Sequence, residues 1–328
     1  MPCTRIFTRG SDTTNRTRKM KRTLILIAFF FSCIGTAQAQ LAAFQDESDI
    51  ITPTFRYDII HMKKVASITI HEEQKPDGKR IYDDGVMQYY RFDSLARLAE
   101  SYYTIKENND NWDTILAHFY YDKRGNLVTK RTNEGSFFDT WYYVWNKENM
   151  LVKEAHVHES SGPGNGPDFK IGTQKMISCD SFAYNIYPKQ IQRFGFNEQN
   201  TQYEKVITQF DDAKRMTSRY SHFQVGWLFS QVDLKYDSVN RLKEYVYAAN
   251  LSGEVHKTVH LIYDKYGNIL TEKVYAGDKQ QHEIEYLYDN STGLISDEID
   301  RDYDKANISI YKFSYTFLDV DDMPPSTN

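Results

Sequence analysis

The stretch Tyr263-Asp264-Lys265-Tyr266-Gly267-Asn268-Ile269 decides the fold, because a nearly identical phrase, Tyr121-Asp122-Lys123-Arg124-Gly125-Asn126-Leu127, stands earlier in the chain. Each phrase consists of an aromatic residue, an acid, a turn, and an aliphatic residue five places after the acid. Self-similarity of this kind indicates a fold assembled from copies of one supersecondary unit. The sequence therefore predicts an architecture more directly than it predicts an activity.

Weaker copies of the phrase extend over most of the chain. Seven of eight acid or amide anchors are followed five places later by Leu, Ile or Met, and the exception is Asn185, which is followed by Gln190. The separations between successive anchors run from 24 to 39 residues, and most lie close to 26. The anchors are Asp93, Asp122, Asn146, Asn185, Asp211, Asp237, Asp264 and Asp289.

The residues before each anchor alternate with period two, which is typical of a half-buried strand. Val259, Leu261 and Tyr263 share one face, for example, while the intervening residues take the other. The Asp that follows can hydrogen-bond the backbone two residues on, and Gly or Asn in the loop accepts positive φ, so each phrase closes a hairpin. The structural turn residues predicted in this way are Tyr121, Asp122, Gly125, Tyr236, Asp237, Tyr263, Asp264, Gly267, Tyr288 and Asp289.

The predicted fold is all-β. A unit of about 26 residues holds two strands of roughly 8 to 10 residues and two turns, and eight such units supply around sixteen strands. Open twisted sheets rarely exceed about ten strands without curling or splitting. We therefore expect an antiparallel meander of repeated β-hairpins that forms a strongly curled or spiralling sheet, or an incomplete barrel. No run shows sustained helical periodicity.

The first 39 residues read as an export signal. Met20-Lys21-Arg22 is a basic start, Leu24 to Phe31 is a short apolar run, and Ala37-Gln38-Ala39 is a small-x-small cleavage pattern. Met20 is then the expected initiator, because residues 1–19 have no export logic of their own. Cys33 follows a small residue and opens the alternative of a lipoprotein signal.

Four further segments are expected. Residues 40–60 form an irregular N-terminal segment, and residues 61–318 form the repeat domain. Within that domain, residues 160–168 make a loop rich in Gly and Pro, and residues 319–328 form a disordered tail.

Charge and cysteine content narrow the function classes. Without the leader the chain has 33 basic and 44 acidic residues, a net charge of about −11, which disfavours a nucleic-acid partner. The sequence predicts no integral membrane segment after signal cleavage and places the protein in the periplasm, at the cell surface or outside the cell of a Gram-negative-type bacterium. Cys179 is the one cysteine outside the leader, so an intramolecular disulfide is impossible.

The phrase resembles the YD repeats of the RHS family, whose units carry Tyr-Asp, two variable residues, Gly, Arg or Asn, then Leu. The similarity is close at residues 121–127 and 263–269, partial at 236–242 and 288–294, and degenerate over roughly residues 85–300. The resemblance implies a strand-turn-strand scaffold of the kind that builds extracellular β shells, with carbohydrate or cell-surface contact proposed for the family. This chain is far shorter than such a shell and shows no toxin domain.

Candidate metal ligands are few. His156 and His158 lie two apart, so they share a strand face, and Glu159 follows them; solvent-facing histidines are the simpler interpretation. His256 and His260 have helical spacing within a predicted strand. The aspartate phrases lack the closely spaced oxygen ligands of calcium loops, so we expect turns there and no metal or cofactor.

No nucleophile motif is present, and Gly162, Gly164 and Gly166 lack the residues of a phosphate-binding loop. We therefore expect a protein that is not an enzyme and that contacts glycans or envelope proteins. Two alternatives stay open: a carbohydrate-active hydrolase with a carboxylate pair distant in sequence, and an outer-membrane β-barrel. Candidate surface aromatics for stacking are Tyr142, Tyr245 and Tyr247.

Overall fold

The computed structural model describes residues 57–106, 112–134, 137–161, 171–224, 226–250 and 255–318. This part of the chain holds one helix and eighteen strands. In chain order they are α2 (Tyr57–Lys63), β1 (Val65–Pro76), β2 (Tyr82–Phe92), β3 (Leu98–Lys106), β4 (Trp112–Tyr121), β5 (Leu127–Glu134), β6 (Phe137–Trp145), β7 (Leu151–Ser161), β8 (Ile171–Tyr187), β9 (Gln190–Phe196), β10 (Gln202–Phe210), β11 (Met216–Phe223), β12 (Phe229–Tyr236), β13 (Leu242–Ala249), β14 (Val255–Tyr263), β15 (Ile269–Ala276), β16 (Lys279–Tyr288), β17 (Ile295–Asp302) and β18 (Asn307–Phe317).

The strands form one antiparallel sheet in which each strand pairs with its neighbours in sequence. The predicted all-β class and the hairpin meander are therefore confirmed. Eight anchored hairpins account for sixteen strands, β2 to β17. The two additional strands, β1 and β18, lie outside the repeated phrases.

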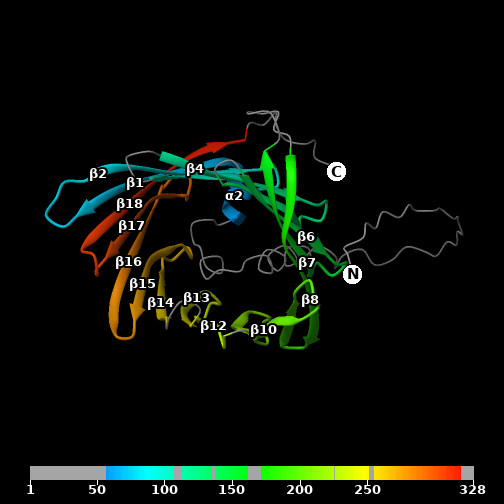
Figure 1. Cartoon of the computed structure of the whole chain (residues 1–328). Coiled ribbons are helices and arrows are strands. Elements are labelled where there is room, and N and C mark those ends of the chain that lie inside the picture. Colours follow the sequence, from blue (N-terminus) through cyan, green and yellow to red (C-terminus); the bar gives the residue numbers. More distant parts are fainter. Residues whose placement is uncertain are drawn as a thin grey trace, which may run out of the picture.

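Those two strands close the sheet into a barrel, so the expected spiral or incomplete barrel is wrong. β1 pairs with β18 along its length, from Val65 opposite Phe317 to Pro76 opposite Asn307. Side chains reinforce the seam: Ser67 and Thr316 share a hydroxyl hydrogen bond of 2.6 Å, and Lys312 Nζ lies 2.7 Å from Glu73 Oε1. Closure removes both exposed strand edges, whose unpaired backbone groups would otherwise invite aggregation. Figure 1 shows the resulting ring of strands.

Helix α2 identifies the inner face of the barrel, because it lies within the ring (Figure 1). Its Ile60 packs in one buried cluster with Ile68, Ile70 and Phe92. Residues directly opposite in antiparallel strands share a face. Tyr90 and Tyr315, which both lie opposite Ile68, therefore also point inward. Repeating this step from strand to strand shows which residues of each strand face the interior and which face outward.

A hydrogen bond between neighbouring hairpins recurs around the ring. The aromatic side chain that precedes an anchor donates to the backbone carbonyl at the start of the second strand of the preceding hairpin. Each such bond contributes roughly 1 kcal/mol. The pairs are Tyr121 to Leu98, Trp145 to Leu127, Tyr184 to Leu151, Tyr236 to Met216, Tyr263 to Leu242 and Tyr288 to Ile269. Tyr315 on β18, which precedes no anchor, donates to Ile295 in the same way.

The turn predicted at the anchor Asn185 is in the wrong place. Asn185 lies inside β8, opposite Gln192, and the hairpin turns only at residues 188–189. Tyr184 still donates to Leu151 like the other anchor aromatics. The turn comes later because Pro188, with its fixed φ, follows the strand and can begin a two-residue corner.

Several expected segments fall outside the described residues: the export signal at 1–39, residues 40–56 of the irregular segment, residues 162–168 of the Gly/Pro loop, and the tail at 319–328. Residues 57–60, the end of the expected irregular segment, begin helix α2.

We predict that Tyr263→Phe lowers the free energy of unfolding by about 1 kcal/mol, because the part-buried carbonyl of Leu242 loses its donor. The measurement is the midpoint of urea unfolding. Tyr266→Phe is the matched control, since this side chain is 76% exposed. Equal midpoints for the two variants would show that the bond between hairpins contributes nothing.

Candidate functional site

The turns that the sequence predicts all lie at one rim of the barrel. In the best-formed one, Asp264 Oδ1 accepts hydrogen bonds from the backbone N–H groups of Tyr266 (2.7 Å) and Asn268 (2.8 Å). Gly267 has a φ of 89°, which glycine adopts without strain. Burial alone would raise the pKa of Asp264, but the hydrogen bonds from Asn268, Tyr266 and Gly267 together hold that pKa below its ordinary value.

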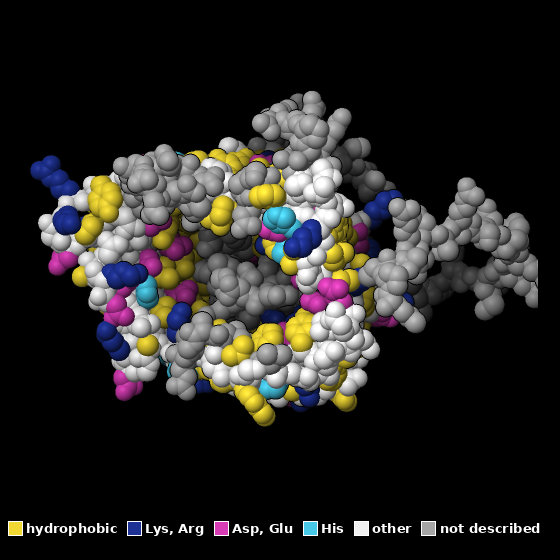
Figure 2. Space-filling view, in the orientation of Figure 1, with side chains coloured by type: hydrophobic (Ala, Val, Ile, Leu, Met, Phe, Trp, Pro, Cys, Tyr) yellow, Lys and Arg dark blue, Asp and Glu magenta, His cyan; other side chains and the backbone are white. Residues whose placement is uncertain are grey.

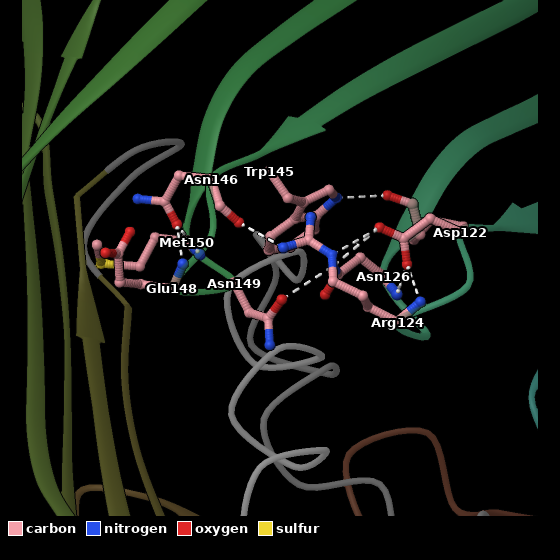
Figure 3. A network of polar contacts seen from close by, with 9 residues as sticks. Asp122, Arg124, Asn126, Trp145, Asn146, Glu148, Asn149 and Met150 are labelled. Carbon is pink, nitrogen blue, oxygen red and sulfur yellow. Dashed lines mark hydrogen bonds and ion pairs between the residues drawn. The ribbon is translucent and has the colours of Figure 1, made fainter. Parts of the chain in front are cut away.

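Neighbouring turns are also joined side by side, as Figure 3 shows. Asp122 Oδ1 accepts from the N–H groups of Arg124 (2.8 Å) and Asn126 (2.9 Å). Arg124 Nη1 then donates to the carbonyl of Asn146 in the next turn (2.9 Å), and Asn126 Nδ2 donates to Asn149 Oδ1 (3.1 Å). The Asp122 carboxylate is thus bonded within its own turn, and Arg124 and Asn126 join that turn to the next one.

The remaining predicted turn residues have equivalent places. Asp237 Oδ1 accepts from the N–H groups of Val239 and Arg241, and Tyr236 lies under the guanidinium of Arg215, 4.5 Å from its ring centre. Asp289 accepts from Ser291 and Thr292, first of all from the Ser291 hydroxyl, and these bonds lower its pKa to about 2. In each of these turns the aspartate carboxylate is therefore engaged in hydrogen bonds within its own turn.

The outer face of the wall carries two rows made mostly of ionisable side chains. The first row has one residue on each strand from β12 to β17, and each residue lies directly opposite the next. A second row of the same kind crosses β2 to β6. Figure 2 shows acidic and basic side chains interspersed in the left half of the view. The first row is Lys235, Glu244, His260, Lys273, Glu283 and Arg301, and the second is Arg91, Glu100, His118, Arg131 and Thr140.

The histidines named from the sequence separate between the two faces. His156 and His158 both point inward and both bond Asp139 Oδ1, at 2.9 and 3.1 Å. Glu159 lies on the other face, where it is fully buried and holds Arg131 at 3.0 Å and Thr140 at 2.8 Å.

His256 and His260 lie on the outer face of β14, opposite Ala248 and Glu244. Among the described residues no group of three or more His, Cys, Asp or Glu side chains is placed to hold a metal ion.

The surface aromatics expected at Tyr142, Tyr245 and Tyr247 do not form a patch. Tyr245 is buried and belongs to the inward-facing hydrophobic core around Val259, and Tyr247 packs against the same core. Tyr142 donates to Glu159 Oε1 at 3.2 Å on the opposite face of the sheet. Cys179 lies in β8 opposite Ala155.

A polar cluster that the sequence did not reveal lies on the inner face of β7 to β10. Arg193 Nη2 donates to Glu204 Oε2 (2.8 Å), and Tyr203 donates to Asp180 Oδ2 (3.1 Å). Glu154 stands opposite Asp180. The side chains of Arg193 and Glu204 are each 9% exposed, and the Arg193 Nε is buried without a hydrogen-bond partner. We call Glu154, Asp180, Arg193, Tyr203 and Glu204 the inner cluster.

Electrostatics within the inner cluster disfavour its negative charges. Burial raises the pKa of Glu154, and Asp180 raises it further, against the lowering effect of Arg193. Burial likewise raises the pKa of Asp180, although the hydrogen bond from Tyr203 opposes this. Carboxyl groups whose pKa is raised and that lie near hydrogen-bond donors are suited to bind a polar guest or to transfer a proton.

Aromatic rings flank the inner cluster. The Arg193 guanidinium lies 4.9 Å from the ring centre of Phe182. Next to it on β6 and β7, Trp141 stacks on His156 with ring centres 4.5 Å apart and planes 6° from parallel. A Cβ atom at Gly195 would lie 3.2 Å from the Tyr203 ring, so a larger residue there would need the ring to shift by a few tenths of an ångström. Rings and polar groups therefore meet on one inner surface.

One signal in the sequence pointed to this surface. Glu154, His156 and His158 follow one another at period two on β7, which places three ionisable groups on one face. Their partners Asp180, Arg193 and Glu204 come from other strands, so no local pattern joins them. Only the register of β7 to β10 brings them together.

A second inner carboxylate is strongly perturbed. Glu298 on β17 lies opposite Tyr286 and Tyr311. Burial, followed by the charges of Asp300 and Glu272, raises the pKa of Glu298 to about 7. The carboxyl group is therefore half protonated near neutral pH.

No protein-family model and no curated protein matches the chain. Solved structures similar to it include a porin-like protein from Bacteroides uniformis (10% identity, TM-score 0.36, covering 77% of this chain and 97% of that one). A porin-like protein from Bacteroides vulgatus is also similar (10% identity, TM-score 0.27, 66% and 98%). A third is the Photorhabdus luminescens Tc holotoxin pore (10% identity, TM-score 0.21, 67% and 14%). Similarity this distant says nothing of function.

We predict that Glu298→Gln stabilises the protein at pH 8 by on the order of 2 kcal/mol and has little effect at pH 4.5. The folded state holds a proton on Glu298 up to about pH 7, whereas an unfolded glutamate releases it near its ordinary pKa of 4.5. Stability is therefore lost as the pH rises through this window, and Gln removes the loss.

The measurement is urea unfolding of both proteins at the two pH values. Glu285→Gln is the control, because this outer-face glutamate lies 2.9 Å from Arg301 in an ordinary ion pair. A gain at pH 4.5 equal to the gain at pH 8 would contradict titration of Glu298 as the cause.

Proposed function

We propose that this chain is an exported barrel of the cell envelope that stands in water and works by binding rather than by catalysis. The observation that carries the proposal is the distribution of side chains across the wall. Rows that contain charged residues cross the outer face, beside exposed apolar residues such as Ile262 and Leu287, whereas the inner face holds buried apolar clusters and the inner cluster. A lipid-facing wall requires the opposite arrangement, because Lys or Arg at the bilayer midplane costs about 2 to 4 kcal/mol.

The proposed guest is a small polyhydroxylated molecule held at the inner cluster. Barrels of 16 to 18 strands are too wide for their own side chains to fill. The inner cluster offers acceptors in Glu154 and Asp180 and a buried donor in Arg193 Nε. Hydroxyl groups can satisfy both kinds of polar group, because each hydroxyl both donates and accepts hydrogen bonds.

A second candidate is an outer-membrane β-barrel, favoured by closure of the sheet. Closed barrels are the form in which strands can span a bilayer, since they leave no unpaired edge, and all eighteen strands pair with two neighbours. In the described part of the chain, no helix has the length and apolarity needed to cross a membrane. The resemblance to YD repeats stays a prediction under either candidate.

We predict that the exported chain is recovered in the soluble envelope fraction and purifies without detergent, because its outer face is charged. The measurement is fractionation of expressing cells, followed by gel filtration. Cys33→Ala is examined in parallel, since a lipid on Cys33 would hold a water-exposed barrel at the membrane. A chain that needs detergent even as Cys33→Ala would establish the outer-membrane candidate instead.

We predict that mono- and disaccharides from a soluble panel bind the wild-type protein, and that Glu154→Gln weakens the best of them at least tenfold. Titration calorimetry measures this. Glu148→Gln, on an exposed rim turn, is the control. Binding that Glu154→Gln leaves unchanged would remove the inner cluster from the function, and release of reducing ends during the titration would indicate a hydrolase.

A further inference from the structure

The outer wall carries a group of aromatic rings near the rim opposite the aspartate turns. Tyr220 and His222 on β11 face outward, and His222 lies opposite Phe229 on β12. The ring centres of Tyr220 and His222 are 6.4 Å apart with planes 13° from parallel, and those of Tyr220 and Phe229 are 6.2 Å apart at 25°. Trp227, in the loop between the two strands, meets His222 edge-on at 6.3 Å. We call these four residues the aromatic platform.

Trp227 is held in solvent by an unfavourable backbone. It is 83% exposed, and its φ of 55° follows a Gly226 with φ of 77°, so two successive residues have the positive φ of the left-handed region. Gly or Asn favours such positions, and a bulky side chain there is strained. No other aromatic residue in the described segments has a positive φ.

The neighbouring strand keeps the loop in this conformation. Asn250 Nδ2 donates to the carbonyl of Trp227 (3.1 Å), and Asn250 Oδ1 accepts from the N–H group of Phe229 (2.7 Å). The backbone N–H of Asn250 also donates to the carbonyl of Phe229 (3.1 Å). Asn250 thus holds the loop at Trp227 and at Phe229. Because the Trp227 side chain is exposed and its backbone is strained, the residue contributes little to folding, and its ring is available for contact with another molecule.

Polar side chains interleave with the rings. Lys205 lies opposite His222, and Gln231 lies opposite Tyr220. Gln231 Nε2 in turn donates to Asp233 Oδ2 at 2.7 Å. Flat rings with amide, carboxylate and ammonium groups between them match a sugar chain, which presents C–H faces and equatorial hydroxyl groups alternately. A protein partner would favour a more continuous apolar area.

We propose that the aromatic platform is a carbohydrate-binding surface that takes an extended β-linked polysaccharide, with Trp227 as its principal stacking residue. The surface lies on the outside of the wall and is separate from the inner cluster. A long chain can lie across the outer face of the sheet without entering the barrel. The platform would therefore attach the barrel to a polymer of its surroundings.

The test is depletion of the full-length protein, expressed with its own N-terminal segment, by insoluble cellulose, chitin and peptidoglycan sacculi. We expect wild-type protein to bind at least one of them, and Trp227→Gly to weaken that binding at least tenfold. Because Gly relieves the positive φ, the melting temperature of Trp227→Gly should equal or exceed that of the wild type. Loss of binding with unchanged or higher stability separates a contact residue from a folding residue.

Two further variants complete the experiment. Trp227→Asn also suits the backbone and should lose binding equally, while Tyr266→Ala removes an aromatic of similar exposure at the other rim and should leave binding intact. Absence of binding to all three polymers, or unchanged binding by both Trp227 variants, overturns the proposal. Glu154→Gln should bind the polymers normally, so failure of the inner cluster as a site is told apart from failure of the platform.

Discussion

The pairing of β1 with β18 is the interaction on which the rest of this structure depends. Without it the wall would be an open sheet with both faces in the same solvent. The difference in side chains between the two faces would then not separate an interior from an exterior. Eleven residues of β1 lie opposite residues of β18, with side-chain bonds at Ser67 and Glu73. Once the ring is closed, each strand has one face toward an enclosed interior and one toward the surroundings.

The repeated phrase has two tasks in the closed ring. Its aspartate folds the corner on to itself, as Asp264 does with Tyr266 and Asn268. Its aromatic residue reaches back to the preceding hairpin, as Tyr263 does to Leu242. Each unit thus stabilises its own turn and fixes the position of its neighbour. This explains why an aromatic residue followed by an acid or amide recurs while the strands between corners differ in length and composition.

The candidate binding residues and the perturbed carboxylates lie away from the repeated phrase. The inner cluster, Glu298 and the aromatic platform all lie in strand interiors or in the loops of the opposite rim, where the phrase imposes no residue. A scaffold of this kind separates the residues that hold the fold from those that are open to change. The rim aspartates bond the protein itself, and the wall between the two rims is where ligand contact is proposed.

Local pattern determined the elements, and long-range pairing determined the rest. The alternation before each anchor and the turn chemistry of Asp and Gly predicted strands, corners and an antiparallel meander, because these depend on residues within about ten positions. Closure could not be predicted, since β1 and β18 carry no phrase and their partners are some 240 residues apart. The turn predicted at Asn185 was wrong for a related reason: β8 continues past this residue to Tyr187, and Pro188 begins the turn instead. The inner cluster draws on four strands and Trp227 on a clamp from Asn250, so register alone created both sites.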